Sequence, residues 1–398
     1  MRICLWLLSL IVPLSAVFAE DLAPARARVP SFNPDISLIL AGGAAHLSND
    51  PARYAIPGFM LSAETGPGER GLSLAESELV MSANVDDLFY GQFTAALSPQ
   101  NEVAVEEAYI QTLGLPHGVS VRAGRFFSAI GYLNNQHPHR WDFVDTALPY
   151  RALLANHYGD DGVGVHWVAP TDVFLELGAE WFRGENFPAG GAANNGQGAA
   201  SLFAHVGGDV GVSHAWRTGL SFLRTQAVGR LSGAIESAPD AFSGDSKLAI
   251  ADLVWKWSPQ GNPKQTNFKF QAEYLWRRED GDFTANVNAV LGLPVTDRYA
   301  ATQSGWYLQA VYKFMPQWRA GLRYDQLRTQ DISAGVNAAL FDTLGQTPRR
   351  VSVMLDWSHS EFSRLRLQFN RDRSQPDADS QVFVQYIMSL GAHGMHAF

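Results

Sequence analysis

Cysteine is almost absent from this chain of 398 residues, because Cys4 is the only one. It lies in an N-terminal segment with the features of a secretory signal peptide, in which Arg2 supplies the positive charge and the run LWLLSLIV supplies the apolar centre. Cleavage after Ala19 would remove Cys4, so the mature chain has no disulfide, thiolate metal site or cysteine nucleophile. We expect residues 1–19 to be a signal peptide and residues 20–398 to form one domain.

Long apolar runs are also missing, because no segment after this leader could cross a bilayer as a helix. The chain lacks a basic balance: 30 lysines and arginines stand against 39 aspartates and glutamates, a net charge of −9. This charge argues against a nucleic-acid partner, which usually requires a basic face. No glycine-rich phosphate loop or nucleophile elbow occurs. In the pairs Ser213-His214 and Ser358-His359, neighbours on a strand face opposite ways and cannot cooperate. We expect no enzymatic activity.

What the chain does contain is a repeated alternation of apolar and polar residues. In the segment 268–277 (FKFQAEYLWR), apolar residues mostly occupy every second position. A period of two places the two sets on opposite faces of a strand. In lipid every backbone polar group must be paired within the protein, which a closed barrel of such strands achieves without a helix. Tryptophans near the ends of many segments are typical of an interfacial girdle rather than of a soluble sandwich. The sequence predicts an all-β, transmembrane, antiparallel β-barrel.

The alternation predicts about sixteen strands, at residues 35–47, 72–85, 88–97, 102–112, 118–127, 161–169, 172–183, 200–208, 212–225, 246–257, 265–278, 303–314, 317–329, 349–358, 362–371 and 380–390. Short turns alternate with longer connections along the chain, as expected when all short turns lie on one side of the membrane. The longest connection, 128–160, is the third long one. It is rich in aromatic residues, and long loops of this kind usually have a function. We expect it to fold toward the lumen; an ordered loop capping the mouth is the alternative.

The segment 119–151 resembles the phosphate-selective porin (porin O and P) family. The matching residues are Gly124, Arg125, Phe126, Gly131, Phe143, Leu148 and Pro149, and the preceding strand VAVEEAYIQ is also similar. The resemblance implies a sixteen-stranded, trimeric outer-membrane porin with a constriction loop. Phosphate selectivity does not follow, because the third loop contains no lysine. Its charged candidates for the constriction are Arg140, Asp142, Asp145 and Arg151. The histidines of the loop also look like those of a proteobacterial subgroup associated with zinc.

Two sets of candidate site residues follow from the pattern. Charged residues that alternate with apolar neighbours should point inward, because an arginine or lysine on the lipid face near midplane costs about 2–4 kcal/mol. The predicted pore-lining residues are Arg122, Lys269, Glu273, Arg277, Lys313, Arg319, Arg323, Arg364 and Arg366. Histidine and carboxylate together suit zinc. The candidate metal ligands are His137, His139, His157 and Asp160, although solvated polar groups in a wet loop would look the same.

These observations leave three functional hypotheses open. The first is a passive porin for small hydrophilic solutes or ions in the outer membrane of a Gram-negative bacterium, working as a homotrimer without a cofactor. The second is a channel or receptor that prefers zinc or another divalent metal, which would then be a bound or transported ion. The third is a structural or surface-binding barrel with a closed lumen. In each case the expected partners are outer-membrane lipid and the barrel-assembly machinery, for which the terminal Phe398 resembles the usual signal.

Overall fold

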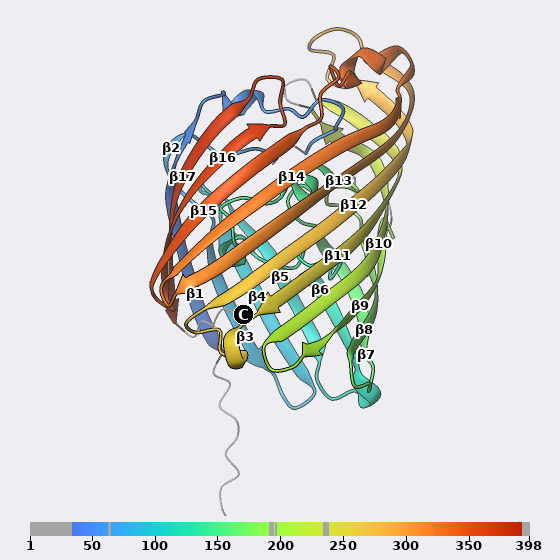
Figure 1. Ribbon diagram of the computed structural model, residues 1–398. Helices are drawn as coiled ribbons and strands as arrows, with labels where there is room; N and C mark the ends of the chain where they lie inside the picture. The colour runs from blue at the N-terminus through green and yellow to red at the C-terminus, as the bar shows by residue number, and fades with distance from the viewer. Residues whose placement is uncertain (1–33, 63–64, 191–194, 196, 234–238, 392–398) are drawn as a thin grey trace, which may run out of the picture. The chain divides into compact units, whose positions relative to one another are not determined.

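The computed structural model describes residues 34–62, 65–190, 195, 197–233 and 239–391. These residues form a closed antiparallel β-barrel (Figure 1). Strands β2 and β3 both pair with β1, so these two short strands occupy a single place in a barrel of sixteen positions. Strand β17 closes the barrel on β1, with Ser37 opposite Gly391. The predicted fold class is confirmed. The predicted signal peptide and Phe398 lie outside the described residues.

The strands are β1 (Asp35–Leu47), β2 (Gly71–Leu74), β3 (Ser77–Asn84), β4 (Phe89–Leu97), β5 (Val103–Thr112), β6 (Val119–Phe127), β7 (Gly159–Val168), β8 (Phe174–Phe182), β9 (Ala199–Val210), β10 (His214–Ser232), β11 (Asp240–Trp257), β12 (Asn267–Ala285), β13 (Val295–Met315), β14 (Trp318–Ser333), β15 (Arg349–Ser360), β16 (Ser363–Arg373) and β17 (Asp379–Gly391). The helical elements are α1 (Leu148–Leu154) and the short 3-10 segments η1 (Pro51–Arg53), η2 (Pro116–Gly118), η3 (Pro138–Arg140), η5 (Pro259–Gly261) and η6 (Gly335–Phe341). Within the described ranges, no helix has the length and apolarity needed to cross a membrane.

The barrel is apolar on the outside and polar on the inside. On β16, Leu365, Leu367 and Phe369 are 40–50% exposed, whereas Arg366 and Gln368 between them are buried. A soluble protein would bury the leucines and expose the arginine. An exposed apolar face of this kind needs lipid around it, and the closed ladder leaves no strand edge unpaired.

Strands β10 to β14 are longer than a membrane requires. They contain 16 to 21 residues each, whereas a tilted transmembrane strand needs about 9–11. The extra residues of β12 and β13 carry charge on the outer face, including the exposed ion pair between Asp280 and Arg298. We infer that this part of the wall rises above the lipid, at the upper right of Figure 1.

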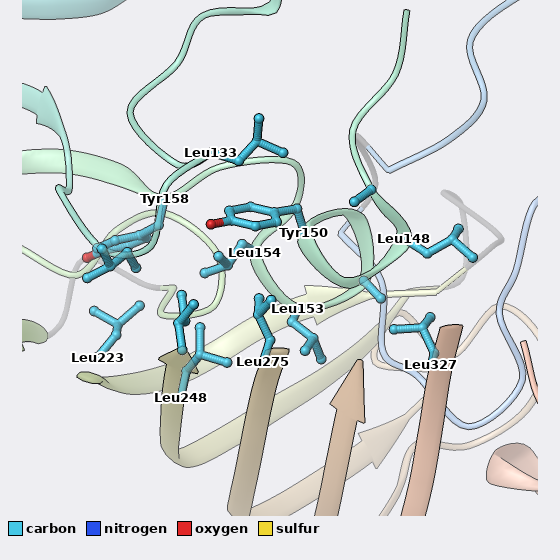
Figure 2. Close-up of a cluster of buried hydrophobic side chains, with 14 of the residues drawn as sticks. Leu133, Leu148, Tyr150, Leu153, Leu154, Tyr158, Leu223, Leu248, Leu275 and Leu327 are labelled. Atoms are coloured by element: carbon cyan, nitrogen blue, oxygen red, sulfur yellow. The ribbon is translucent and has the colours of Figure 1, made fainter. Parts of the chain in front are cut away.

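The connection between β6 and β7, residues 128–158, folds into the barrel and is called the inner loop here. All seven residues of its helix α1 are buried. Leucines on the inner face of the wall, including Leu223, Leu248 and Leu275, pack against Leu153 and Leu154 of this loop (Figure 2). The loop therefore folds toward the lumen, as predicted, and lies against the β10–β14 side of the barrel.

The first external connection, 48–70, also turns inward, which the sequence analysis did not anticipate. Tyr54, Ile56 and Phe59 are buried in it, and Tyr54 stacks beneath Arg151 of the inner loop with 5.6 Å between guanidinium carbon and ring centroid. The side-chain amide of Gln303 on β13 donates to the carbonyl of Gly58. Among the described residues, the inner loop is therefore not alone in entering the lumen.

Candidate functional site

The inner loop is fixed to the wall through Asp145. Its carboxylate accepts hydrogen bonds from Arg323 of β14 at 2.7 Å and from Arg350 of β15 at 2.6 Å. Arg151 of α1 adds a third contact at 3.3 Å. Burial alone would raise the pKa of Asp145, but these three arginines lower it well below its usual range. The carboxylate is therefore ionised and clamps the loop to two strands.

A second clamp is formed by Asp142 of the inner loop. It pairs with Lys269 of β12 and with Arg319 of β14, the latter at 3.1 Å, and Gln309 donates to it at 3.1 Å. Burial again opposes ionisation, but Lys269 and Arg319 lower the pKa of Asp142 to about 2. Arg319 also pairs with Asp356, so that the loop and three strands share one charge network.

The root of the loop is held by Glu273 of β12. It accepts hydrogen bonds from the backbone N–H groups of Tyr132 and Leu133 at 3.0 and 3.1 Å, and from the Tyr150 hydroxyl at 2.7 Å. The hydroxyl of Tyr307 on β13 donates to it at 2.5 Å. Glu273 was predicted to line a pore, but it is buried and holds the loop instead.

Four predicted pore-lining arginines are also buried. They lie on the inner face, but Arg364 and Arg366 donate to loop carbonyls, those of His139 at 2.6 Å and Trp141 at 3.0 Å. Arg323 forms an ion pair with Asp145, and Arg277 donates a hydrogen bond to Gln303. The inner loop therefore contacts Arg323, Arg364 and Arg366, whereas Arg277 is bonded within the wall.

The remaining predicted residues are more accessible. Arg122 of β6 is half-buried, bonded to Gln111 at 2.9 Å and stacked on Tyr109. Lys313 is half-buried near the end of β13, and Lys269 and Arg319 reach Asp142 from the same wall. Of the loop residues predicted for the constriction, Arg140 is exposed, whereas Asp142, Asp145 and Arg151 belong to the clamps.

The opposite side of the lumen, from β3 to β8, is lined by polar side chains that the loop does not cover. The inner-face residues Gln92, Tyr109, Gln111, His166 and Glu176 are all half-buried. They are linked in short hydrogen bonds, such as that from the Tyr109 hydroxyl to Gln92 at 3.1 Å. These side chains therefore stay partly exposed inside the barrel.

The histidines of the inner loop lie at the top of this polar side, facing glutamates of β3 and β5. His137 Nδ1 is 3.0 Å from Glu106 and 3.3 Å from Glu78, and its Nε2 is 2.9 Å from Glu107. His139 Nδ1 is 2.8 Å from Glu78. Burial opposes charge on His137, but the bonds with Glu106 and Glu107 raise its pKa well above the usual value.

Two local irregularities aim these glutamates inward. Thr94 of β4 pairs with Glu107 and the next residue pairs with Val105, so Glu106 is an extra residue, a β-bulge. The break between β2 and β3 inserts another extra residue beside β1. A regular strand would send Glu106 and Glu107 to opposite faces; the bulge brings both to His137. Sequence reasoning missed these glutamates, although the Glu-Glu doublet in the apolar alternation was a usable signal.

The other predicted metal residues divide between two places. His157 lies by the cluster: its ring packs on Phe127 with centroids 4.2 Å apart, and Phe127 also contacts His137. Burial lowers the pKa of His157, and its Nδ1 has no hydrogen-bond partner among the described residues. Asp160 is elsewhere. It accepts from the backbone N–H groups of Gly184 and Glu185, and the structure does not bring it together with the three histidines.

A cavity of about 330 Å³ lies beside the cluster. Its lining includes Glu76, His139 and His157 on one side and Asp145 and Arg151 on the other. The cavity therefore touches both the histidine–glutamate cluster and the clamp of the inner loop.

No protein-family model matches this chain. An uncharacterized protein of Aquifex aeolicus (strain VF5) is 32% identical over 403 residues, covering 92% of this chain and 80% of that protein. This chain belongs to the same family as the Aquifex protein. The sequence relationship extends over nearly the whole barrel and its loops.

Several solved structures share the fold. The outer membrane channel DcaP of Acinetobacter baumannii has a TM-score of 0.55 at 11% identity, over 90% of this chain and 97% of that one. The anion-selective porin from Comamonas acidovorans has a TM-score of 0.54 at 11% identity, over 90% and 99%. Pseudomonas putida OprB has a TM-score of 0.53 at 11% identity, over 90% and 94%. At such identities the likeness concerns the fold, which is that of outer-membrane porins.

This fold and the apolar exterior make the chain an outer-membrane barrel of a Gram-negative bacterium. The general resemblance to porins is confirmed at the level of fold. The narrower resemblance to the phosphate-selective family, and the link to a zinc-associated subgroup, stay predictions.

Proposed function

We propose that the protein is an outer-membrane channel for passive diffusion of small hydrophilic solutes or ions, narrowed by the inner loop. The observation that carries this proposal is the double clamp of Asp142 and Asp145, which fixes the loop inside the lumen against the β10–β15 side. The solute path then follows the polar residues of β4 to β8. No catalytic step is part of this function.

Acidic and basic side chains are distributed unevenly around the lumen. Basic side chains belong to the β12–β16 wall, and glutamates belong to β3, β5 and β8. Because the arginines are paired with Asp142, Asp145 and Asp356, the path itself is lined by polar and acidic groups, which select solutes by size and charge. We expect polar, uncharged or zwitterionic solutes to pass more readily than apolar ones of equal size.

A homotrimer is part of the proposal. One of the structures with the same fold, OmpT of Vibrio cholerae, is described in a trimer form, with a TM-score of 0.52 at 10% identity over 90% of this chain and 99% of that one. Cross-linking of the detergent-solubilised protein followed by mass determination tests this point, and a single-chain mass would contradict it.

Liposome swelling tests the channel itself. Purified protein in liposomes should admit small sugars and amino acids at rates that fall steeply with solute size. Liposomes that stay impermeable to every solute would contradict the proposal and favour the barrel with a closed lumen. A metal-preferring channel is the second candidate, and the histidine–glutamate cluster is the observation that favours it.

A further inference from the structure

Four glutamates gather at the upper end of the polar side of the lumen, where histidines rather than lysines or arginines are their partners. In the described part of the chain, no lysine or arginine forms an ion pair with Glu76, Glu78, Glu106 or Glu107. Glu78, Glu106 and Glu107 form their ion pairs with imidazoles, Gln92 donates to Glu107, and Glu78 and Glu76 each retain a buried carboxylate oxygen without a hydrogen bond. Across the lumen, Asp142 and Asp145 each have two or three basic partners. Buried carboxylates are usually paired or bind metals, and the ion-pair partners of these glutamates are imidazoles, which are themselves metal ligands.

Three ligand atoms are already in position for one. Nδ1 of His137 and one carboxylate oxygen each of Glu78 and Glu106 lie within 4.8 Å of one another. The two distances from Nδ1 are 3.3 and 3.0 Å. Ligands bound at about 2.1 Å in a tetrahedral zinc site lie roughly 3.4 Å apart. The observed spacing is therefore close to that of a coordination shell, and only small shifts are needed to admit an ion.

The surroundings of His137 match those of a metal-binding histidine. Its second ring nitrogen, Nε2, is 2.9 Å from Glu107, and Glu107 in turn accepts from the side-chain amide of Gln92 at 2.8 Å. A carboxylate on the far nitrogen of a ligating histidine fixes its tautomer and makes it a better donor. This arrangement leaves Nδ1 directed at Glu78 and Glu106.

A fourth ligand is available in His157. Its ring packs on Phe127, which also contacts the ring of His137. The buried Nδ1 of His157 has no hydrogen-bond partner among the described residues. His139 and His157 line the 330 Å³ cavity, so an ion can arrive from that side.

We propose that Glu78, Glu106 and His137, completed by His157 or water, bind a divalent transition-metal ion of the zinc class. Mixed imidazole and carboxylate ligands suit Zn²⁺, Co²⁺ or Ni²⁺ better than Mg²⁺ or Ca²⁺, which take oxygen ligands. The bound ion joins the inner loop to β3 and β5, opposite the Asp142 and Asp145 clamps. This proposal concerns binding and does not depend on flow through the barrel.

Calorimetric titration of the full chain in detergent, after removal of metals with a chelator, tests the site. Wild type should bind one Zn²⁺ more tightly than Mg²⁺. His137→Ala and Glu106→Gln should each weaken Zn²⁺ binding by about tenfold or more. His205→Ala is the matched control, because His205 is also a buried histidine on a glutamate, Glu176, but lies outside the cluster. Wild-type affinity in both site variants, or an equal loss in His205→Ala, would overturn the proposal.

Two further measurements keep the result unambiguous. Each variant should keep the heat-modifiable electrophoretic mobility of a folded barrel, so that lost binding is not lost structure. Co²⁺ added to the metal-free wild type should give the intense visible absorption of a four-coordinate ion, and Glu106→Gln should lose it; a weak, six-coordinate spectrum in wild type would contradict the ligand set. Metal binding is measured in detergent micelles, independently of conductance. A barrel that conducts no current in lipid would therefore contradict the proposed channel but not the metal site.

Discussion

Asp145 of the inner loop and Arg350 of β15 lie 2.6 Å apart, from Oδ2 to Nη1, although 205 residues separate them in the chain. Arg350 is fully buried and also bonds to Asp325 of the neighbouring strand at 2.8 Å. This ion pair joins residues that are far apart in the sequence, and it holds the inner loop against the β15 side of the lumen.

Asp145→Asn should loosen the inner loop. It removes the charge that Arg323 and Arg350 share, and a buried ion pair broken on one side costs about 3–5 kcal/mol. Chemical unfolding of the barrel in detergent measures this loss. The control is Asp245→Asn, which breaks an exposed pair with Arg224 and should cost less than about 1 kcal/mol. Equal effects of the two variants would show that the Asp145 contacts do not stabilise the loop.

Acid should release the second clamp only at very low pH. Because the pKa of Asp142 is lowered to about 2, its ionised form contributes stability above the unfolded value of about 3.9, and this contribution is lost as pH falls toward 2. We expect channel conductance, corrected for the electrolyte, to be constant from about pH 7 to 4 and to rise below about pH 3. Asp142→Asn should show a smaller rise. An equal rise in Asp142→Asn and wild type would contradict the clamp.

Leu153→Ala should destabilise the loop through packing rather than charge. Leu153 is fully buried between α1 and the wall, and removal of such a side chain costs about 2–5 kcal/mol. Leu293→Ala is the matched control, since Leu293 is 86% exposed and should change stability little. Limited proteolysis should cut the Leu153→Ala loop faster than the wild-type loop, and identical cleavage rates would place the loop outside this core.

Leu367→Arg tests the lipid-facing surface. Leu367 lies in the middle of β16 and is 50% exposed on the outer face. An arginine there should cost about 2–4 kcal/mol near the bilayer midplane. Refolding into lipid vesicles measures this cost, and Leu293→Arg on an external loop should refold as wild type does. A tolerated Leu367→Arg would argue against lipid contact at this position.

The strands were predicted well where one face contacts lipid and the other faces the lumen, because apolar and polar residues then alternate. The segment predicted at 362–371 is β16, Ser363–Arg373, because leucines and arginines alternate through it. The segment predicted at 303–314 is β13, Val295–Met315, and eight residues were missed at its start. There Asp297 and Arg298 lie beyond the lipid, where apolar alternation is no longer required.

The candidate site was predicted less completely, for a physical reason. His137, His139 and His157 come together because one loop carries them. Glu78 and Glu106 join them through the register of β3 and β5 and through a bulge, which no local pattern specifies. The arginines were placed on the correct face, but their burial depends on how the loop folds over them, a tertiary contact that alternation cannot reveal.

Single-channel recording in planar bilayers, comparing wild type with a variant whose residues 136–155 are replaced by a short Gly-Ser linker, tests the central claim most directly. The replacement removes both clamps and α1, while Asn134 still joins Ser128 and Tyr158 at the base of the loop. A control shortening of the external connection 287–293 should leave conductance unchanged. The account predicts small, steady openings in wild type and clearly larger ones in the loop variant. Equal conductance of the two, or silence of both correctly folded proteins, would contradict it.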